Sequence, residues 1–162
     1  MRPLHHRWPG TLVLACVAVA GLARPASAQV APDTVAREGI AAFNRALDAA
    51  TRRMDDTSML ALWEDDGVSL LPATAPLVGK PAIAAFLSGV SAAFPGGHME
   101  TFTNACHDVE ISGAWATEWC VEHQVVLLPG GRRFEGSGKL LLVLHRGADG
   151  RWRLRREMWN AA

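Results

Sequence analysis

The chain contains no tyrosine, only three cysteines and no surplus of charge of either sign. Its 162 residues hold 16 lysines and arginines against 16 aspartates and glutamates, so a polyanion such as nucleic acid meets no general attraction. One uncharged apolar run stands out, at residues 11–23, and it is well short of the ~20 apolar residues that cross a bilayer. No second long run of this kind follows, which excludes a protein with several membrane helices.

The first 28 residues have the three parts of a cleavable secretory signal. A basic start precedes the apolar run at 11–23, and Ala26-Ser27-Ala28 provides the small side chains that signal peptidase requires. We therefore expect cleavage after Ala28 and a periplasmic or secreted domain of residues 29–162, with no membrane contact after cleavage. Lipidation at Cys16 is the weaker interpretation, because the apolar segment before it is very short and continues beyond it.

Removal of the signal makes the domain mildly acidic. It leaves 13 basic and 16 acidic residues, which give a formal charge of −3. A negative net charge does not favour nucleic acid as a partner. The remaining chain suits a single domain with one core. No cofactor is predicted. No metal site is predicted either, because the four histidines of this part are scattered and lack the spacing of metal ligands (His98, His107, His123 and His145).

The mature chain divides into a helical half and a strand half. Apolar residues recur at helical spacing after Asp33, a helix near Met59 is expected to end in the turn Glu64-Asp65-Asp66-Gly67, and Pro81 begins a third helix. A short strand is expected at 68–71. The later segments alternate as strands and are separated by glycine-containing turns, which predicts an antiparallel meander with strands at 99–111, 114–128, 133–146 and 151–159.

Two cysteines, Cys106 and Cys120, lie on neighbouring predicted strands. A two-residue loop at Ser112-Gly113 sets Cys106 opposite Trp119, whereas a three-residue loop with a bulge sets it opposite Cys120, within disulfide reach. An oxidising compartment would preserve such a disulfide. The sequence leaves both alternatives open.

The register of the next hairpin decides which side chains share a face of the sheet. If Leu128 lies opposite Arg133, Glu122 lies opposite Lys139, and Gln124 lies opposite Ser137 on the same face. Both faces of the sheet are then largely apolar, and the helices of one chain can cover only one of them. A homodimer through the sheet is the simplest second cover.

Several motifs in this order resemble the nuclear transport factor 2-like superfamily, and within it the SnoaL-like, ketosteroid-isomerase-like branch of unassigned function. They are Trp63-Glu64-Asp65-Asp66-Gly67, Pro72, Gly79-Lys80, Ser112-Gly113, Gly138-Lys139, Asp149-Gly150-Arg151-Trp152 and Trp159-Asn160. The resemblance implies an α+β fold, with a cone of three N-terminal helices packed on a strongly curved, mainly antiparallel sheet. It also implies a cavity inside the cone and frequent pairing of subunits through their sheets.

The resemblance does not imply that this chain catalyses the isomerase reaction. That chemistry needs a carboxylate base and an oxyanion hole made by a tyrosine and a protonated aspartate. This chain has no tyrosine, the base position falls on Leu71, and the neutral-acid position falls on Lys139. Steroid isomerisation by that machinery is therefore not expected.

Two functions of different classes fit these residues. The first is an exported binding domain that holds a small lipophilic ligand or partner in its cavity, with Gln124 and Trp159 contacting it. The second is a cofactor-free isomerase, cyclase or dehydratase that transfers protons on an apolar carbonyl compound through Lys139, Glu122 or Glu157. The simpler interpretation of Glu122 and Lys139 is a cross-strand ion pair without chemistry. Whether Glu157 and Trp159 face the cavity depends on the register of the last strand.

Overall fold

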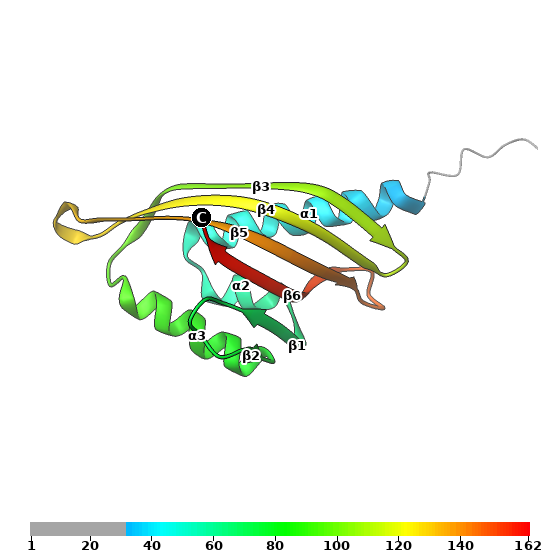
Figure 1. Ribbon diagram of the computed structural model, residues 1–162, viewed down its shortest axis with the longest axis horizontal. Coiled ribbons are helices and arrows are strands. Elements are labelled where there is room, and N and C mark those ends of the chain that lie inside the picture. Colours follow the sequence, from blue (N-terminus) through cyan, green and yellow to red (C-terminus); the bar gives the residue numbers. More distant parts are fainter. Residues whose placement is uncertain (1–31) are drawn as a thin grey trace, which may run out of the picture.

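The computed structural model describes residues 32–162 and shows three α-helices and one sheet of six strands (Figure 1). The helices are α1 (Pro32–Arg53), α2 (Asp56–Ala61) and α3 (Lys80–Ala93). The strands are β1 (Trp63–Leu70), β2 (Leu77–Val78), β3 (His98–Ser112), β4 (Trp115–Leu127), β5 (Arg133–Arg146) and β6 (Trp152–Ala161). None of these helices is long and apolar enough to cross a membrane. The predicted signal segment and its cleavage site lie outside the described residues.

The sheet is mixed and curved, with the strand order β2-β1-β6-β5-β4-β3. The predicted meander is confirmed, because β3 to β6 pair antiparallel in chain order. The two short strands extend it, since β1 runs parallel to β6 and antiparallel to β2. Figure 1 shows β3, β4 and β5 as long strands that pass across α1, with α2 and α3 grouped near β1.

The core forms where α1 packs on one face of the sheet. The apolar stripe predicted for this helix is buried, with Ile40 2% and Phe43 4% exposed. It meets Leu142, Leu144 and Leu154, which are fully buried. Burial of each such side chain stabilises the fold by about 1.5–3 kcal/mol, so this interface accounts for much of the folding free energy.

The acidic segment after α2 is part of a strand. We predicted that Glu64-Asp65-Asp66-Gly67 forms a turn, but β1 begins at Trp63 and its pairing with β6 shifts between Trp63 and Val68. Basic side chains neutralise this irregular stretch. Lys80 Nζ lies 3.0 Å from Asp65 Oδ1, and Arg155 contacts both Glu64 and Asp66. Each of the three acids thus has a cationic partner from α3 or β6.

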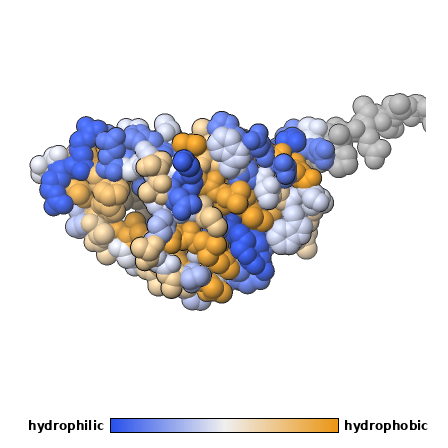
Figure 2. Space-filling view, in the orientation of Figure 1, coloured by the Kyte–Doolittle hydropathy of each residue, from blue (hydrophilic) through white to orange (hydrophobic). Residues whose placement is uncertain are grey.

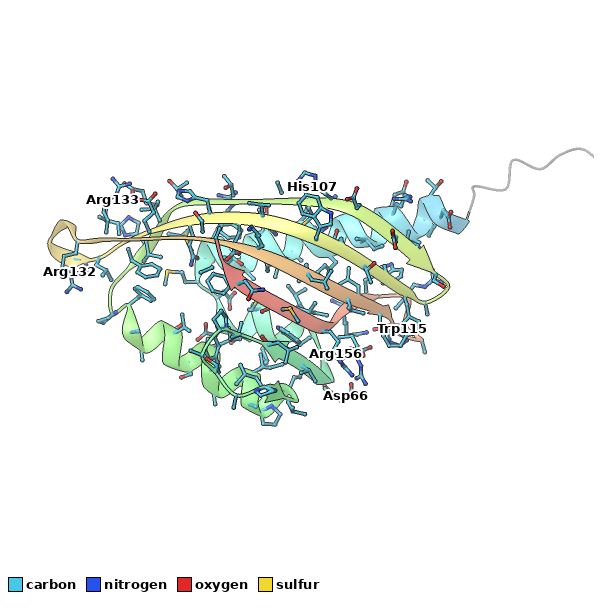
Figure 3. All side chains as sticks on the ribbon, viewed as in Figure 1. Asp66, His107, Trp115, Arg132, Arg133 and Arg156 are labelled. Carbon is cyan, nitrogen blue, oxygen red and sulfur yellow. A yellow bond between two sulfur atoms is a disulfide. The ribbon has the colours of Figure 1, made fainter. Side chains whose placement is uncertain are left out.

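The predicted register of the β4–β5 hairpin is wrong by one residue. Arg133 pairs with Leu127, so residues 128–132 form the loop, which the Leu128 N–H closes by donating to the Arg132 carbonyl at 2.7 Å. Arg132 and Arg133 stand at the end of the sheet opposite Trp115 (Figure 3). Because side chains alternate between faces, this slip moves Lys139 to the face opposite Glu122. Lys139 pairs with Val121, and the predicted Glu122–Lys139 pair does not exist.

A disulfide joins Cys106 to Cys120 across β3 and β4. The turn that leads to this pairing differs from both predicted alternatives. Two residues, Gly113 and Ala114, connect Ser112 to its partner Trp115, and the register then shifts between His107 and Glu110. Asp108 has a positive φ of 53° at this shift. A bulge inside the strand, rather than a longer turn, therefore brings the cysteines opposite each other.

Candidate functional site

A cavity of about 400 Å³ lies between the helices and the inner face of the sheet, which is the face that packs on α1. Its lining is predominantly apolar and comes from all three helices, from all six strands and from the segment that joins β1 to β2. The apolar lining residues are Leu47, Met59, Trp63, Leu71, Pro72, Leu77, Ile83, Phe86, Leu87, Val90, Phe102, Leu140 and Trp159. Polar side chains gather mainly on the sheet wall, where Ser69, Asn104, Glu122, Gln124 and Glu157 lie.

Two carboxyl groups enter the cavity from β4 and β6. The indole Nε1 of Trp159 donates to Glu122 Oε1 at 2.6 Å, and the hydroxyl of Ser69 donates to Glu157 Oε1 at 3.1 Å. Gly138 lies opposite Glu122 on β5. A Cβ at Gly138 would overlap the Trp159 indole, so the glycine provides the space in which this ring reaches Glu122.

Both carboxyl groups bind protons more tightly than ordinary glutamates. Burial raises the pKa of Glu157 to about 7; the Ser69 hydroxyl opposes this shift, and the negative charge of Glu122 adds to it. Burial also raises the pKa of Glu122, against the hydrogen bond from Trp159. Near neutral pH, Glu157 is therefore present in both its protonated and its ionised form.

Four of the five predicted site residues line this one cavity: Glu122, Gln124, Glu157 and Trp159. Lys139 is the exception, because its side chain is exposed on the outer face of the sheet, where Asn160 is its partner on β6. Leu71, where the resemblance places the isomerase base, also lines the cavity and supplies no base.

The sequence analysis missed two polar residues of the sheet wall. Ser69 is 3% exposed and holds Glu157, and Asn104 faces Glu122 across the β3–β4 pairing. The Asn104 Oδ1 atom is buried, and no residue of the described chain donates a hydrogen bond to it. Neither residue belongs to a recognisable motif, so only their place on the inner face reveals them.

A third buried acid, Glu118, lies outside the cavity. It is 2% exposed, accepts a hydrogen bond from Asn44 Nδ2 at 2.9 Å, and has its pKa raised by burial. Its carboxylate and the sulfurs of Cys106 and Cys120 lie within 4.8 Å of one another. Because the disulfide occupies both sulfurs, this group is not a metal site in the form that the structure shows.

Three helices on a curved mixed sheet that encloses an apolar cavity define a protein of the nuclear transport factor 2-like fold class. The SnoaL-like domain family matches residues 33–157, and the chain belongs to that family. No curated protein matches the chain.

Solved structures support the same fold. A ketosteroid isomerase-like protein from Erwinia carotovora atroseptica is 22% identical, with a TM-score of 0.66 over 76% of this chain and 94% of that one. A conserved protein from Planctomyces limnophilus is 21% identical, with a TM-score of 0.68 over 80% and 99%. A member of the NTF2-like family from Streptomyces avermitilis is 20% identical, with a TM-score of 0.66 over 81% and 99%. At these identities the likeness shows the fold alone.

Proposed function

We propose that this protein binds a small, mainly apolar molecule in the cavity, with a polar group of that molecule directed at Glu122 and Glu157. The observation that carries the proposal is the cavity itself. Its volume of about 400 Å³ lies within the usual range for small-molecule sites. Its apolar lining with a few converging polar groups is also the usual composition of such sites.

The neutral fluorescent probe N-phenyl-1-naphthylamine tests this proposal, since its emission rises in apolar surroundings. The wild-type protein should enhance the emission, and Leu87→Trp, which fills the cavity from α3, should remove the enhancement. Val78→Trp is the matched control, because Val78 is 64% exposed and does not line the cavity. Equal enhancement by the wild type and Leu87→Trp would show that the probe binds elsewhere and would contradict the proposal.

A second candidate function is proton transfer on an apolar carbonyl compound, of the isomerase, cyclase or dehydratase type and without a cofactor. The observation that favours it is Glu157, whose pKa of about 7 suits a general acid or base near neutral pH. Exchange of the α-protons of 2-tetralone in D₂O, followed by NMR, tests this candidate. The wild type should accelerate the exchange and Glu157→Gln should not; no acceleration by the wild type would exclude proton transfer on this class of compound.

We also propose that residues 1–28 direct export and are removed after Ala28, so that the domain works in the periplasm or outside the cell. The basic start, the apolar run and the small residues before Gln29 support this proposal. N-terminal sequencing of the protein recovered from expressing cells tests it. A recovered chain that begins at Met1 would contradict it.

The outer face of the sheet supports the proposed homodimer. Trp119, Val121, Leu141 and Met158 lie on neighbouring strands and are each more than 40% exposed. Figure 2 shows hydrophobic residues that reach the surface across the middle of the molecule. A second copy of the chain would bury them by packing sheet on sheet. Sedimentation should show a dimer for the wild type and a monomer for Leu141→Arg, whereas a monomeric wild type would contradict the proposal.

A further inference from the structure

The polar wall of the cavity is rich in hydrogen-bond acceptors, and only some of them accept a bond from a neighbouring side chain. Glu122 and Glu157 bring four carboxyl oxygens, and Asn104 adds an Oδ1 atom that no described residue satisfies. The indole N–H of Trp159 and the hydroxyl of Ser69 each donate to one carboxyl oxygen, and the amides of Asn104 and Gln124 are the other donors on this wall. A ligand with N–H or O–H donors of its own would satisfy the carboxyl oxygens and the Asn104 Oδ1 atom that remain unbonded.

The ionisable side chains that line the cavity are all acidic. Glu122 and Glu157 are the only ionisable side chains among the described residues that line it, since Lys139 lies on the outer face. Asp55 and Asp56 line a neighbouring pocket, where hydrogen bonds from Ser58 and Ser91 hold them. On α1, the guanidinium carbon of exposed Arg52 lies 5.5 Å from the centre of the Phe102 ring, whose residue lines the cavity. Ionised carboxylates in this cavity thus have no counter-ion from the lining.

We propose that the ligand of this cavity is a lipophilic amine that binds as its ammonium ion, with the N–H groups directed at Glu122, Glu157 and Asn104. This inference rests on the binding function proposed above and names the class of ligand. An ammonium group supplies up to three donors and the missing positive charge together, which a ketone or a hydrocarbon cannot do. A carboxylate ligand would be repelled by the two glutamates.

The remainder of the cavity suits the apolar body of such a molecule. Four aromatic rings line it, from Trp63, Phe86, Phe102 and Trp159. Rings of this kind pack against hydrocarbon and also attract an ammonium group through their π faces. The lining therefore favours a compact amine with an aromatic or branched aliphatic body over a strongly polar polyamine.

The test compares three probes of similar size and different charge: 2-phenylethylamine, 2-phenylethanol and 3-phenylpropanoate. At about pH 8.5 the amine is still largely protonated and Glu157 is largely ionised. Calorimetry should then give an amine affinity at least about tenfold above that of the alcohol, with the anion weakest. As the pH falls below 7, Glu157 takes up a proton, so the amine affinity should fall while that of the alcohol stays constant.

Isosteric variants show which group confers the preference. Glu157→Gln should reduce the amine affinity about tenfold and leave the alcohol affinity within about twofold. Glu110→Gln is the matched control, because Glu110 is an exposed acid of the same sheet that does not line the cavity. Its amine affinity should equal that of the wild type.

The outcomes separate this inference from the function on which it rests. If the alcohol binds as tightly as the amine at about pH 8.5, or if the amine affinity does not depend on pH, the ligand is not an amine. The cavity then remains a binding site for neutral molecules. Stronger binding of 3-phenylpropanoate overturns the charge argument in the same way. If neither the three probes nor N-phenyl-1-naphthylamine binds, the proposed binding function is wrong, and the inference is wrong with it.

Discussion

Glu118 and Glu122 lie four residues apart on the same face of β4, and burial raises the pKa of both, yet they belong to regions of different kinds. Glu118 is sealed beside Asn44 and the disulfide, in a part of the core that α1 covers. Glu122 opens into a cavity that also holds Glu157. A buried, proton-binding carboxyl group is thus not in itself a functional site, because a ligand can reach only the one that adjoins empty space.

The two regions should differ most in the stability that is lost when a leucine is replaced by alanine. Leu142→Ala creates a cavity in the sealed core and should lower the free energy of unfolding by about 2–5 kcal/mol. Leu87→Ala only enlarges a cavity that already exists and should cost about 1 kcal/mol. Denaturant unfolding of both variants measures the contrast. Equal costs would show that the cavity is not open in solution.

Loss of the disulfide should have the next largest effect on the free energy of unfolding. Replacement of both Cys106 and Cys120 by alanine releases a loop of 14 residues and should cost about 3 kcal/mol. Affinity for N-phenyl-1-naphthylamine should stay unchanged, because neither cysteine lines the cavity. Guanidinium unfolding with and without a reducing agent measures the loss; a reductant should have no effect on the double variant. Weaker probe binding in this variant would show that the two regions are coupled.

The change in stability with pH should be smaller than the loss caused by removal of the disulfide. Glu157 has a folded-state pKa of about 7 against an ordinary 4.5, so its contribution is complete below about pH 4.5, falls as the pH rises to 7, and then stays constant. The difference in pKa corresponds to at most about 3 kcal/mol, and contact with solvent through the cavity reduces it to about 2 kcal/mol. Thermal unfolding between pH 4 and 8 should show this decline in the wild type, and less of it in Glu157→Gln.

The matched variant for this measurement is Glu118→Gln. It should also reduce the decline of stability with rising pH, because burial raises the pKa of Glu118 as well. Only Glu157→Gln should change the affinity for 2-phenylethylamine. A Glu118→Gln protein with altered affinity would remove the distinction between the sealed acid and the cavity acids.

The smallest effect is expected at Lys139. Lys139→Met should change the free energy of unfolding by less than about 0.5 kcal/mol, because the side chain is exposed on the outer face and has no acidic partner in the described part of the chain. Ligand affinity should be unchanged as well. A loss of binding in this variant would mean that the register of β4 and β5 differs in solution.

The amino-acid sequence alone determined the helices, the four long strands and most of the site. The 3.6-residue spacing of apolar side chains located α1, and alternation between glycine-containing turns located β3 to β6 within two residues at each end. Polar residues on an otherwise apolar strand face singled out Glu122 and Gln124, and the motifs of the family resemblance singled out Glu157 and Trp159. These signals are local, so a sequence contains them in full.

The tertiary structure decided which of these side chains meet. Both faces of the sheet are rich in apolar residues, so the hydrophobic pattern does not determine the register, and a one-residue difference in the 128–132 loop was enough to exchange Lys139 for Gly138 opposite Glu122. Ser69 and Asn104 joined the site only through pairing between strands. The cavity likewise depends on how α3 and β1 pack against the sheet, which is a long-range property that no local pattern specifies.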